Sequence, residues 1–180
     1  EVAALCRPRA TGRGDFIFRE GEPALAVQIA AEGRVKIVRE TAAGRQVVLR
    51  LINPGELFGV AGGWGAETYP AGARALVAGV VLQLPAREFF RLLAERPDLA
   101  LAVIADLGRR LREIESRVLD LETGDVEARL ARALLRLTAG GLSPVVALTR
   151  QDLADLTGTT LSTASRTLST WHRGEIVAAL

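Results

Sequence analysis

The 180-residue sequence has little of the chemistry that many function classes need, with one cysteine, one histidine and one lysine. A single cysteine, Cys6, cannot build a disulfide framework, and a lone thiol is typical of a protein from a reducing compartment. No apolar run approaches the roughly 20 residues that a membrane helix needs, and no segment resembles a signal peptide. We therefore expect a cytoplasmic protein without a membrane partner.

An excess of one charge is also missing. The formal net charge is +2, and residues 125–180 contain six arginines against five acidic residues. A strongly basic segment would by itself indicate nucleic-acid binding, so here that function must rest on a motif. Apolar residues make up 49% of the chain, which is enough for a full core, and disorder is not expected.

Residues 14–84 are expected to form a small antiparallel roll or barrel. Glycines recur every eleven or twelve residues, at 21, 33, 44 and 55, and the β-branched runs 27–29, 35–38 and 47–51 lie between them. Short strands at this spacing with turns between them are typical of such a fold. Asn53-Pro54-Gly55 predicts one turn, and two further strand-like runs end at Leu84.

Some barrels of this kind, the cupin-like ones, are metalloenzymes, and their sites need several histidine and carboxylate ligands that converge on one metal. The only histidine, His172, lies outside the predicted roll. The sequence also contains no nucleophile–base pair, no P-loop and no dinucleotide fingerprint. We therefore expect neither an enzyme nor a metal site.

The next segment is expected to be helical, with a short helix from Pro85 to Leu93 and a long one that begins at Pro97-Asp98. The apolar residues of the long helix are three and four positions apart, which is the period of a coiled-coil seam, and charged side chains flank them. This seam consists of Ile104, Leu107, Leu111, Ile114, Val118 and Leu121. We expect a parallel homodimer through residues 98–121, and packing of the stripe against the roll is the alternative.

Residues 148–168 predict two short helices joined by a tight turn. Thr149 and Thr160 can cap the two helices, and Gly158 favours the left-handed conformation that ends the first. The apolar face of the second helix consists of Ala164, Leu168 and Trp171. Its other side carries Ser, Thr and Arg without the usual Glu and Lys. An ordinary core helix pair does not explain that composition, whereas a DNA-binding helix-turn-helix does.

Two sets of DNA contacts are expected from this motif. The side chains at the start of the second helix are those that meet base edges in the major groove: Leu161, Ser162, Thr163, Ser165 and Arg166. Groups at the N-termini of the two helices are expected to bind phosphate: Thr149, Arg150, Gln151 and Thr160. Residues 173–177 predict a turn into a strand, the start of an incomplete wing.

The order of roll, long helix and helix-turn-helix resembles the CRP/FNR family of bacterial transcription regulators. The resemblance covers essentially the whole chain and is carried by residues 18–22, 33–36, 54–59 and 148–168. It implies an α+β fold with a cyclic-nucleotide-binding-like jelly roll (residues 1–97), a dimerisation helix and hinge (98–124) and a winged helix-turn-helix domain (125–180). It further implies a homodimer on a near-palindromic promoter site, RNA polymerase as a partner, and a sensory role for the roll.

The same resemblance places an effector pocket at Phe58, Gly59, Val60, Tyr69 and Arg74. Members that bind cyclic AMP carry Gly-Glu after this Phe, for the ribose, and an Arg-Ser or Arg-Thr pair for the phosphate. Here Val60 and Tyr69-Pro70 stand at those positions. Because a buried phosphate needs a cation or a cluster of donors, cyclic AMP is not expected as the effector. Arg74 lies four residues further along and is expected to be structural.

The sequence also bears on iron–sulfur and haem chemistry in the roll. An iron–sulfur cluster needs four thiolates, and only Cys6 is present. Tyr69-Pro70-Ala71 resembles the nitric-oxide-responsive, DNR-like branch, so haem stays open as a cofactor although the predicted roll contains no histidine. Cys6 is open as an axial ligand or redox switch, while a half-buried structural thiol is the commoner role. The alternatives to a regulator with an unidentified effector are a haem- or redox-linked nitric oxide sensor and a structural dimer without active DNA binding.

Overall fold

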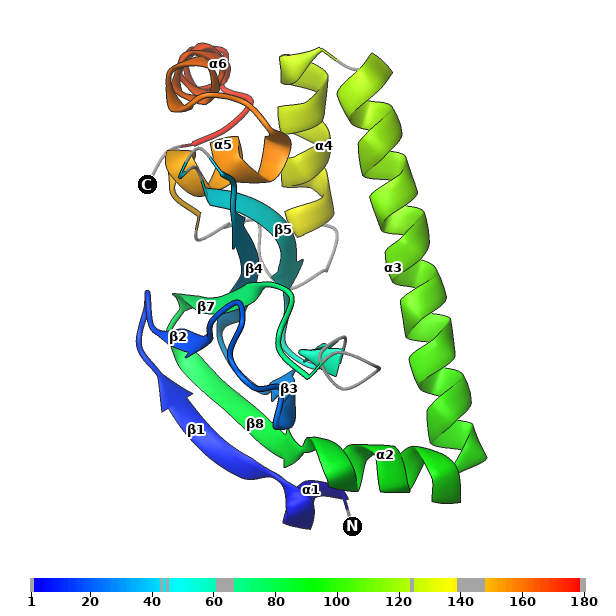
Figure 1. Cartoon of the computed structure of the whole chain (residues 1–180). Coiled ribbons are helices and arrows are strands. Elements are labelled where there is room, and N and C mark those ends of the chain that lie inside the picture. Colours follow the sequence, from blue (N-terminus) through cyan, green and yellow to red (C-terminus); the bar gives the residue numbers. More distant parts are fainter. Residues whose placement is uncertain are drawn as a thin grey trace. The chain divides into compact units, whose positions relative to one another are not determined.

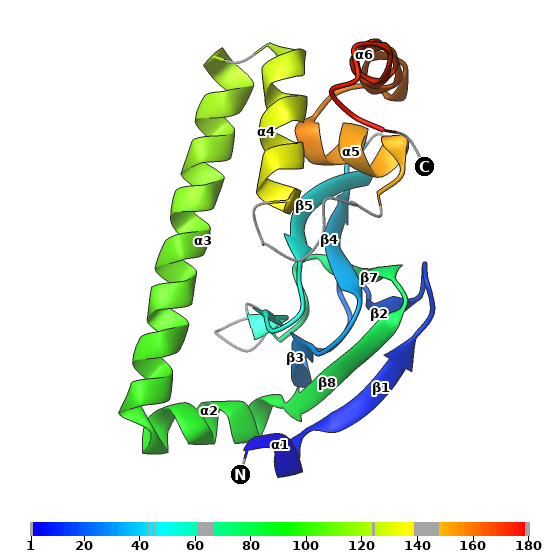
Figure 2. The same ribbon diagram turned by 180° about the vertical axis from the view of Figure 1, so that it is seen from behind.

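The computed structural model describes residues 2–42, 44, 46–60, 67–123, 125–138 and 148–178. The chain divides into two compact units, Glu1–Arg109 and Arg110–Leu180, and each is considered by itself (Figures 1 and 2). No helix in these described ranges is long and apolar enough to cross a lipid bilayer.

The N-terminal unit begins with α1 (Val2–Leu5) and continues as a roll of two four-stranded antiparallel sheets (Figure 1). The strands are β1 (Arg7–Thr11), β2 (Phe16–Phe18), β3 (Ala26–Ala30), β4 (Arg34–Glu40), β5 (Gln46–Ile52), β6 (Leu57–Phe58), β7 (Gly72–Val77) and β8 (Gly79–Pro85). One sheet has the order β1-β8-β3-β6 and the other β2-β7-β4-β5. The chain changes sheet at almost every connection, as in a jelly roll, so the predicted fold class is confirmed.

The predicted strands lie inside β3, β4 and β5, and the two runs that end at Leu84 are β7 and β8. The predicted turn before β6 is confirmed, with Gly55 in the left-handed region at φ 86°. The roll begins earlier than predicted, because β1 pairs with β8 from Arg7 onwards. β1 is an edge strand with mostly exposed side chains, and it lacks the β-branched run that predicted β3, β4 and β5.

Two glycines allow neighbouring turns of the roll to touch. A Cβ atom on Gly79 would lie 2.2 Å from the carbonyl oxygen of Glu32, and one on Gly33 would lie 2.6 Å from that of Ala78. Either contact is far inside van der Waals distance, so the backbones can approach this closely only where side chains are absent.

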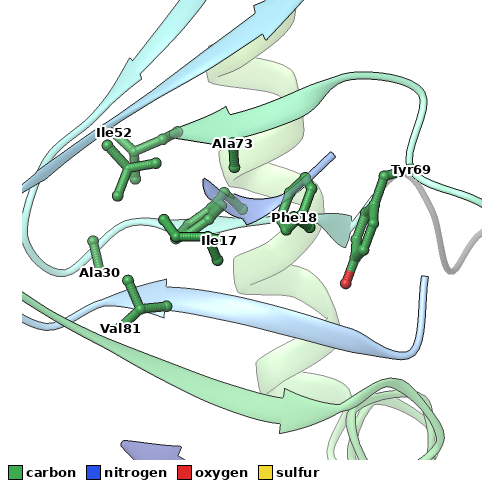
Figure 3. Packing of buried hydrophobic residues seen from close by; sticks show 9 residues of the cluster. Ile17, Phe18, Ala30, Ile52, Tyr69, Ala73 and Val81 are labelled. Atoms are coloured by element: carbon green, nitrogen blue, oxygen red, sulfur yellow. The ribbon is translucent and has the colours of Figure 1, made fainter. Parts of the chain in front are cut away.

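The core between the two sheets contains two stacked aromatic rings (Figure 3). Its buried members are Ile17, Phe18, Ala30, Val35, Ile52, Phe58, Tyr69, Ala73 and Val81. The rings of Phe18 and Tyr69 have centroids 3.7 Å apart and an interplanar angle of 13°. Tyr69 therefore packs as a core residue of the roll.

A second cluster covers the outer face of the roll, where α2 (Ala86–Glu95) and the first part of α3 (Pro97–Thr123) pack. Its buried members are Val27, Val60, Leu84, Phe89, Leu92 and Val103. Leu107, predicted as part of the dimer seam, packs against this cluster. For this residue the alternative prediction, packing against the roll, is the one that the structure shows. The compact units divide inside α3, after Arg109, because the start of the helix belongs to the packing of the roll.

The rest of the seam has a different environment. Ile104, Leu111, Ile114 and Val118 have between 50% and 59% of their surface exposed. The side chain of Leu121, the last predicted member, lies outside the described part of the structure. These four large apolar residues are thus available for contact with another surface.

The C-terminal unit contains α4 (Val126–Thr138), α5 (Arg150–Thr157) and α6 (Leu161–Arg173). In both views α4 lies between the end of α3 and the pair formed by α5 and α6. The buried core consists of Leu130, Ala133, Leu153, Ala154, Ala164 and Trp171. The indole Nε1 of Trp171 donates a hydrogen bond of 2.7 Å to Glu127, which fastens α6 to the start of α4.

The predicted wing is only partly found. Residues 174–175 form a turn, but residues 174–178 contain no strand. The N–H of Ile176 donates to the carbonyl of Trp171, and that of Glu175 donates to the carbonyl of His172. These N–H groups close the end of α6, where a helix otherwise leaves carbonyls without partners, so a strand does not begin here.

Candidate nucleic-acid interface and sensory site

The N-terminus of α5 is held by a capping box, which confirms the predicted cap. Thr149 Oγ1 accepts a hydrogen bond of 3.0 Å from the N–H of Asp152, and Asp152 Oδ2 accepts one of 3.2 Å from the N–H of Thr149. The hydroxyl of Thr149 also donates to Asp152 over 2.6 Å. Both donors of Thr149 are thus directed to Asp152, so this residue stabilises the helix end. The exposed side chains beside it are Arg150 and Gln151.

The turn between α5 and α6 is built as predicted. Gly158 has φ 65° and ψ 34°, the left-handed conformation, and its N–H donates to the carbonyl of Ala154. Thr160 caps α6 by accepting a hydrogen bond of 3.2 Å from the N–H of Thr163. The hydroxyls of Ser162 and Thr163 lie 3.0 and 2.9 Å from that of Thr160, so three hydroxyls cluster at the start of α6.

The predicted base-reading residues do not all have the same exposure. Leu161, Ser162 and Arg166 are exposed, whereas Thr163 and Ser165 are half-buried beside the core. Residues 162 and 166 are one turn apart and therefore share a helix face. The three exposed side chains are free to approach a DNA groove without any change in the packing of α6.

The phosphate candidate of α5 lies next to this helix. Arg150 Nη1 donates a hydrogen bond of 3.4 Å to Ser169 Oγ on α6. The other exposed candidate, Gln151, donates to Asp155 over 2.6 Å. The structure therefore brings Arg150 to the polar side of α6, where Ser169 lies one turn beyond Arg166.

Charge is distributed unevenly in this domain. α6 contains Arg166 and Arg173 but no acidic residue. By contrast, Asp152 is buried in the cap of α5, and Glu127 is bonded to Trp171 at the start of α4. The balanced count of charges over residues 125–180 thus conceals a helix whose charged groups are positive only, which suits a polyanion.

The residues predicted for the effector pocket do not form a polar site. Tyr69 is 4% exposed, and its hydroxyl donates a hydrogen bond of 2.5 Å to the carbonyl of Ala26. Val60 belongs to the outer cluster with α2, and Arg74 Nε donates over 2.7 Å to the carbonyl of Gly14. The bond to Gly14 is consistent with a structural role for Arg74, which stays a prediction.

Gly59 and Phe58 complete the predicted pocket. Gly59 has φ 76°, and a Cβ atom there would lie 3.4 Å from the rings of both Phe18 and Tyr69. Phe58 is buried in the same cluster. The described part of this region is therefore filled by aromatic packing, and its one polar tip, the hydroxyl of Tyr69, is already bonded to the main chain. A cyclic phosphate requires charged or multiple donors, and Phe58, Gly59 and Tyr69 do not supply them.

Two buried groups add to what the sequence indicated about the roll. Gln28, in β3, is 2% exposed, and its Oε1 has no hydrogen-bond partner among the described residues. In the sequence, the position of this polar residue between Val27 and Ile29 was the signal that could have indicated it.

Cys6 is half-buried beside the outer cluster, and burial raises the pKa of its thiol. A raised pKa disfavours the thiolate that metal binding and redox exchange need.

In the ranges that the structure describes, no three His, Cys, Asp or Glu side chains come together where they could hold a metal ion.

The helix-turn-helix region contains two arginines whose contacts the sequence did not predict. Arg117 and Arg129 donate hydrogen bonds to carbonyl oxygens at the end of α5. Their partners lie 39 and 28 residues away in the chain, so no local pattern indicates them.

Comparison with known proteins agrees with this architecture. Residues 8–96 match the family described as the cyclic nucleotide-binding domain, and residues 128–179 match the Crp-like helix-turn-helix domain. A "CRP-like cAMP-activated global transcriptional regulator" of Mycobacterium tuberculosis is 31% identical to this chain over 97% of its length and 83% of the relative. The "Cyclic AMP receptor protein" of Thermus thermophilus is 33% identical over 87% of this chain and 72% of the relative.

The solved structure of FixK2 from Bradyrhizobium japonicum has the same fold, with a TM-score of 0.87 at 23% identity. The match covers 97% of this chain and 88% of that one. A roll of the cyclic-nucleotide-binding type is thus followed by a Crp-like helix-turn-helix, and relatives at 31% and 33% identity match 97% and 87% of this chain. The chain belongs to the CRP/FNR family of bacterial transcription regulators.

Proposed function

We propose that the chain acts as a homodimer that binds a near-palindromic promoter site through α6, under the control of a signal received by the roll. The observation that carries this proposal is the exposed face of α6. This face presents Ser162 and Arg166 without any acidic residue, next to Arg150 at the N-terminus of α5. In a helix-turn-helix this helix enters the major groove.

The exposed side chains have distinct proposed roles. Arg166 reads guanine through two hydrogen bonds, to O6 and N7. Ser162 donates to or accepts from a base edge, and Leu161, 46% exposed, contacts a thymine methyl. Arg150 and the main-chain N–H groups at the start of α5 bind phosphate and set the register on the duplex.

The dimer is proposed to form through the exposed apolar residues of α3. Ile104, Leu111, Ile114 and Val118 follow the 3–4 spacing of a two-stranded seam. A row of large exposed apolar side chains marks an interaction surface rather than a monomer surface. A two-fold dimer presents two copies of α6, which predicts a palindromic site with half-sites about one helical turn apart.

Cyclic AMP is not proposed as the effector, although the names of two relatives include it. The ring of Tyr69 stacks on Phe18, and its hydroxyl is bonded to Ala26. Val60 packs in the outer cluster, so these described residues do not fit a cyclic nucleotide. The part of the roll that the structure describes does not favour haem either, since Cys6 is half-buried in an apolar cluster and burial raises its pKa. The proposal also includes RNA polymerase as a partner, a cytoplasmic location and the lack of an enzymatic activity.

Selection of DNA from a random-sequence library tests the proposal directly. The wild-type chain is expected to enrich duplexes with two-fold symmetry and a guanine at equivalent positions of both halves. Arg13, exposed on the roll, supplies the control, and Arg13→Ala should select the same sequence. Failure to enrich any sequence, or enrichment of a motif without symmetry, would refute the proposed function.

A further inference from the structure

Two arginines from different helices bind the C-terminus of α5. Arg117 Nη2 donates a hydrogen bond of 2.8 Å to the carbonyl of Leu156, and Arg129 Nε donates one of 3.1 Å to that of Thr157. Leu156 and Thr157 are the last two residues of the helix. Carbonyls at a helix C-terminus lack intrahelical partners and carry the negative end of the helix dipole, so guanidinium groups stabilise them.

The carbonyls one turn earlier are bonded within the helix-turn-helix itself. Ala154 accepts from the N–H groups of Gly158 and Thr159, and Leu153 accepts from the hydroxyl of Thr157. The turn therefore closes on local bonds. The turn after α5 does not need the two arginines to form. Their hydrogen bonds instead link the C-terminus of α5 to α3 and α4.

The two arginines differ in what they attach. Arg129 lies on α4, which shares the buried core of the DNA-binding domain with α5 and α6. Arg117 lies on α3, next to the exposed Val118 of the proposed dimer seam. α3 ends at Thr123, and α4 begins at Val126. The bond from Arg117 to α5 therefore adds a direct link, across this junction, between the dimer helix and the helix-turn-helix.

The side chains of α5 and α6 share one buried core, which fixes the orientation of the two helices relative to each other. Leu153 and Ala154 of α5 pack in the same cluster as Ala164 and Trp171 of α6. A hydrogen bond that restrains the C-terminus of α5 therefore also restrains the orientation of α6. A bond between α3 and α5 transmits the direction of the dimer helix to the helix that reads DNA.

We propose that Arg117 is a positioning residue that orients each helix-turn-helix on its dimer helix and so sets the half-site spacing that the dimer accepts. The inference rests on the proposed function, namely dimeric binding to two half-sites. Arg117 touches no base in this proposal. It acts through Leu156, α5 and the shared core on the angle at which the two copies of α6 reach the duplex.

The test uses the full chain and three kinds of duplex. The first is the palindrome selected by the wild-type chain, the second carries two extra base pairs at its centre, and the third is a single half-site. Two added base pairs rotate one half-site by about 70° relative to the other. If geometry forbids simultaneous contact, wild-type affinity should fall about 100-fold or more, because the gain from bivalent binding is lost.

Arg117→Ala should reduce this spacing penalty to less than about 10-fold, since each DNA-binding domain can then turn to meet its half-site. Affinity for the single half-site should stay within about twofold of wild type. Arg117→Lys should give an intermediate penalty, because an ammonium group can still donate one bond to the carbonyl of Leu156. Arg112→Ala is the matched control, as Arg112 is an exposed arginine of the same helix, and it should keep the wild-type penalty.

The outcomes separate the inference from the function on which it rests. A full spacing penalty in Arg117→Ala, or an equal loss of affinity on all three duplexes, overturns the positioning role and leaves the proposed function intact. Dissociation of the Arg117→Ala dimer in sedimentation analysis also overturns it, because Arg117 would then act in the seam. If the wild-type chain binds the palindrome no better than the half-site, dimeric reading fails and the inference fails with it.

Discussion

Substitution of Arg166 and of Arg150 should affect DNA binding in two different ways. Arg166 is exposed on α6, one turn from Ser162, so truncation to alanine disturbs no core packing and changes DNA contacts alone. A bidentate arginine–guanine pair contributes about 1–3 kcal/mol of discrimination, so Arg166→Ala should cost about that much for each half-site of the cognate duplex. Binding to random DNA should remain nearly unchanged, because that binding depends on phosphates.

Arg150 provides the contrast within the same domain. The hydrogen bond from its side chain to Ser169 is long at 3.4 Å, so its loss should leave the helix pair intact. A phosphate contact carries no sequence information, and Arg150→Ala should therefore weaken cognate and random DNA about equally. The slope of log affinity against log salt should flatten by about 0.9 per half-site, because one fewer counterion is released.

Competition gel shifts at two salt concentrations measure both effects. Arg166→Lys is a useful third variant, since lysine keeps the charge but cannot form the planar bidentate pair, and it should lose discrimination while the salt slope stays unchanged. If Arg166→Ala weakens cognate and random DNA to the same extent, the base-reading role is refuted. If Arg150→Ala leaves the salt slope unaltered, Arg150 contacts no phosphate.

Further predictions concern the dimer, the roll and the core of the DNA-binding domain. Leu111→Asp combined with Val118→Asp would place charges in the seam at a cost of several kcal/mol and should yield monomers in light scattering; a wild-type monomer at tens of micromolar would contradict the seam. Cyclic AMP should not bind, since the missing phosphate contacts cost about 3 kcal/mol, over a hundredfold in affinity, and micromolar binding by calorimetry would overturn this expectation. The raised pKa of Cys6 predicts that its alkylation accelerates only at a higher pH than that of a free thiol; a rate profile like that of a model thiol would show that burial has no such effect. Trp171→Phe removes the bond to Glu127 and should lower the free energy of unfolding by about 1–3 kcal/mol in urea titration; no change would mean that the bond adds nothing to stability.

Local interactions explain which parts of the chain could be predicted. The caps at Thr149 and Thr160 join groups three residues apart, and Gly158 ends α5 through its own backbone conformation. The strands between the glycines follow from β-branched runs. Because each of these features depends on neighbours in the chain, the sequence by itself determined the helix-turn-helix, the order of the elements and a small antiparallel roll, and the family resemblance specified the jelly-roll class. Which of its side chains contact DNA remains a prediction.

Contacts between distant residues had to come from the tertiary structure. The hydroxyl of Tyr69 donates to the carbonyl of Ala26, 43 residues away, and this residue, predicted for the effector pocket, is buried in the core of the roll. Arg117 reaches α5 across 39 residues, and its charge alone does not distinguish it from the other arginines of α3. Leu107 fits the heptad as well as Leu111 does, yet it packs against the roll while Leu111 is exposed. A periodic pattern states that a side chain lies on a face, but only the packing of whole elements decides what that face meets.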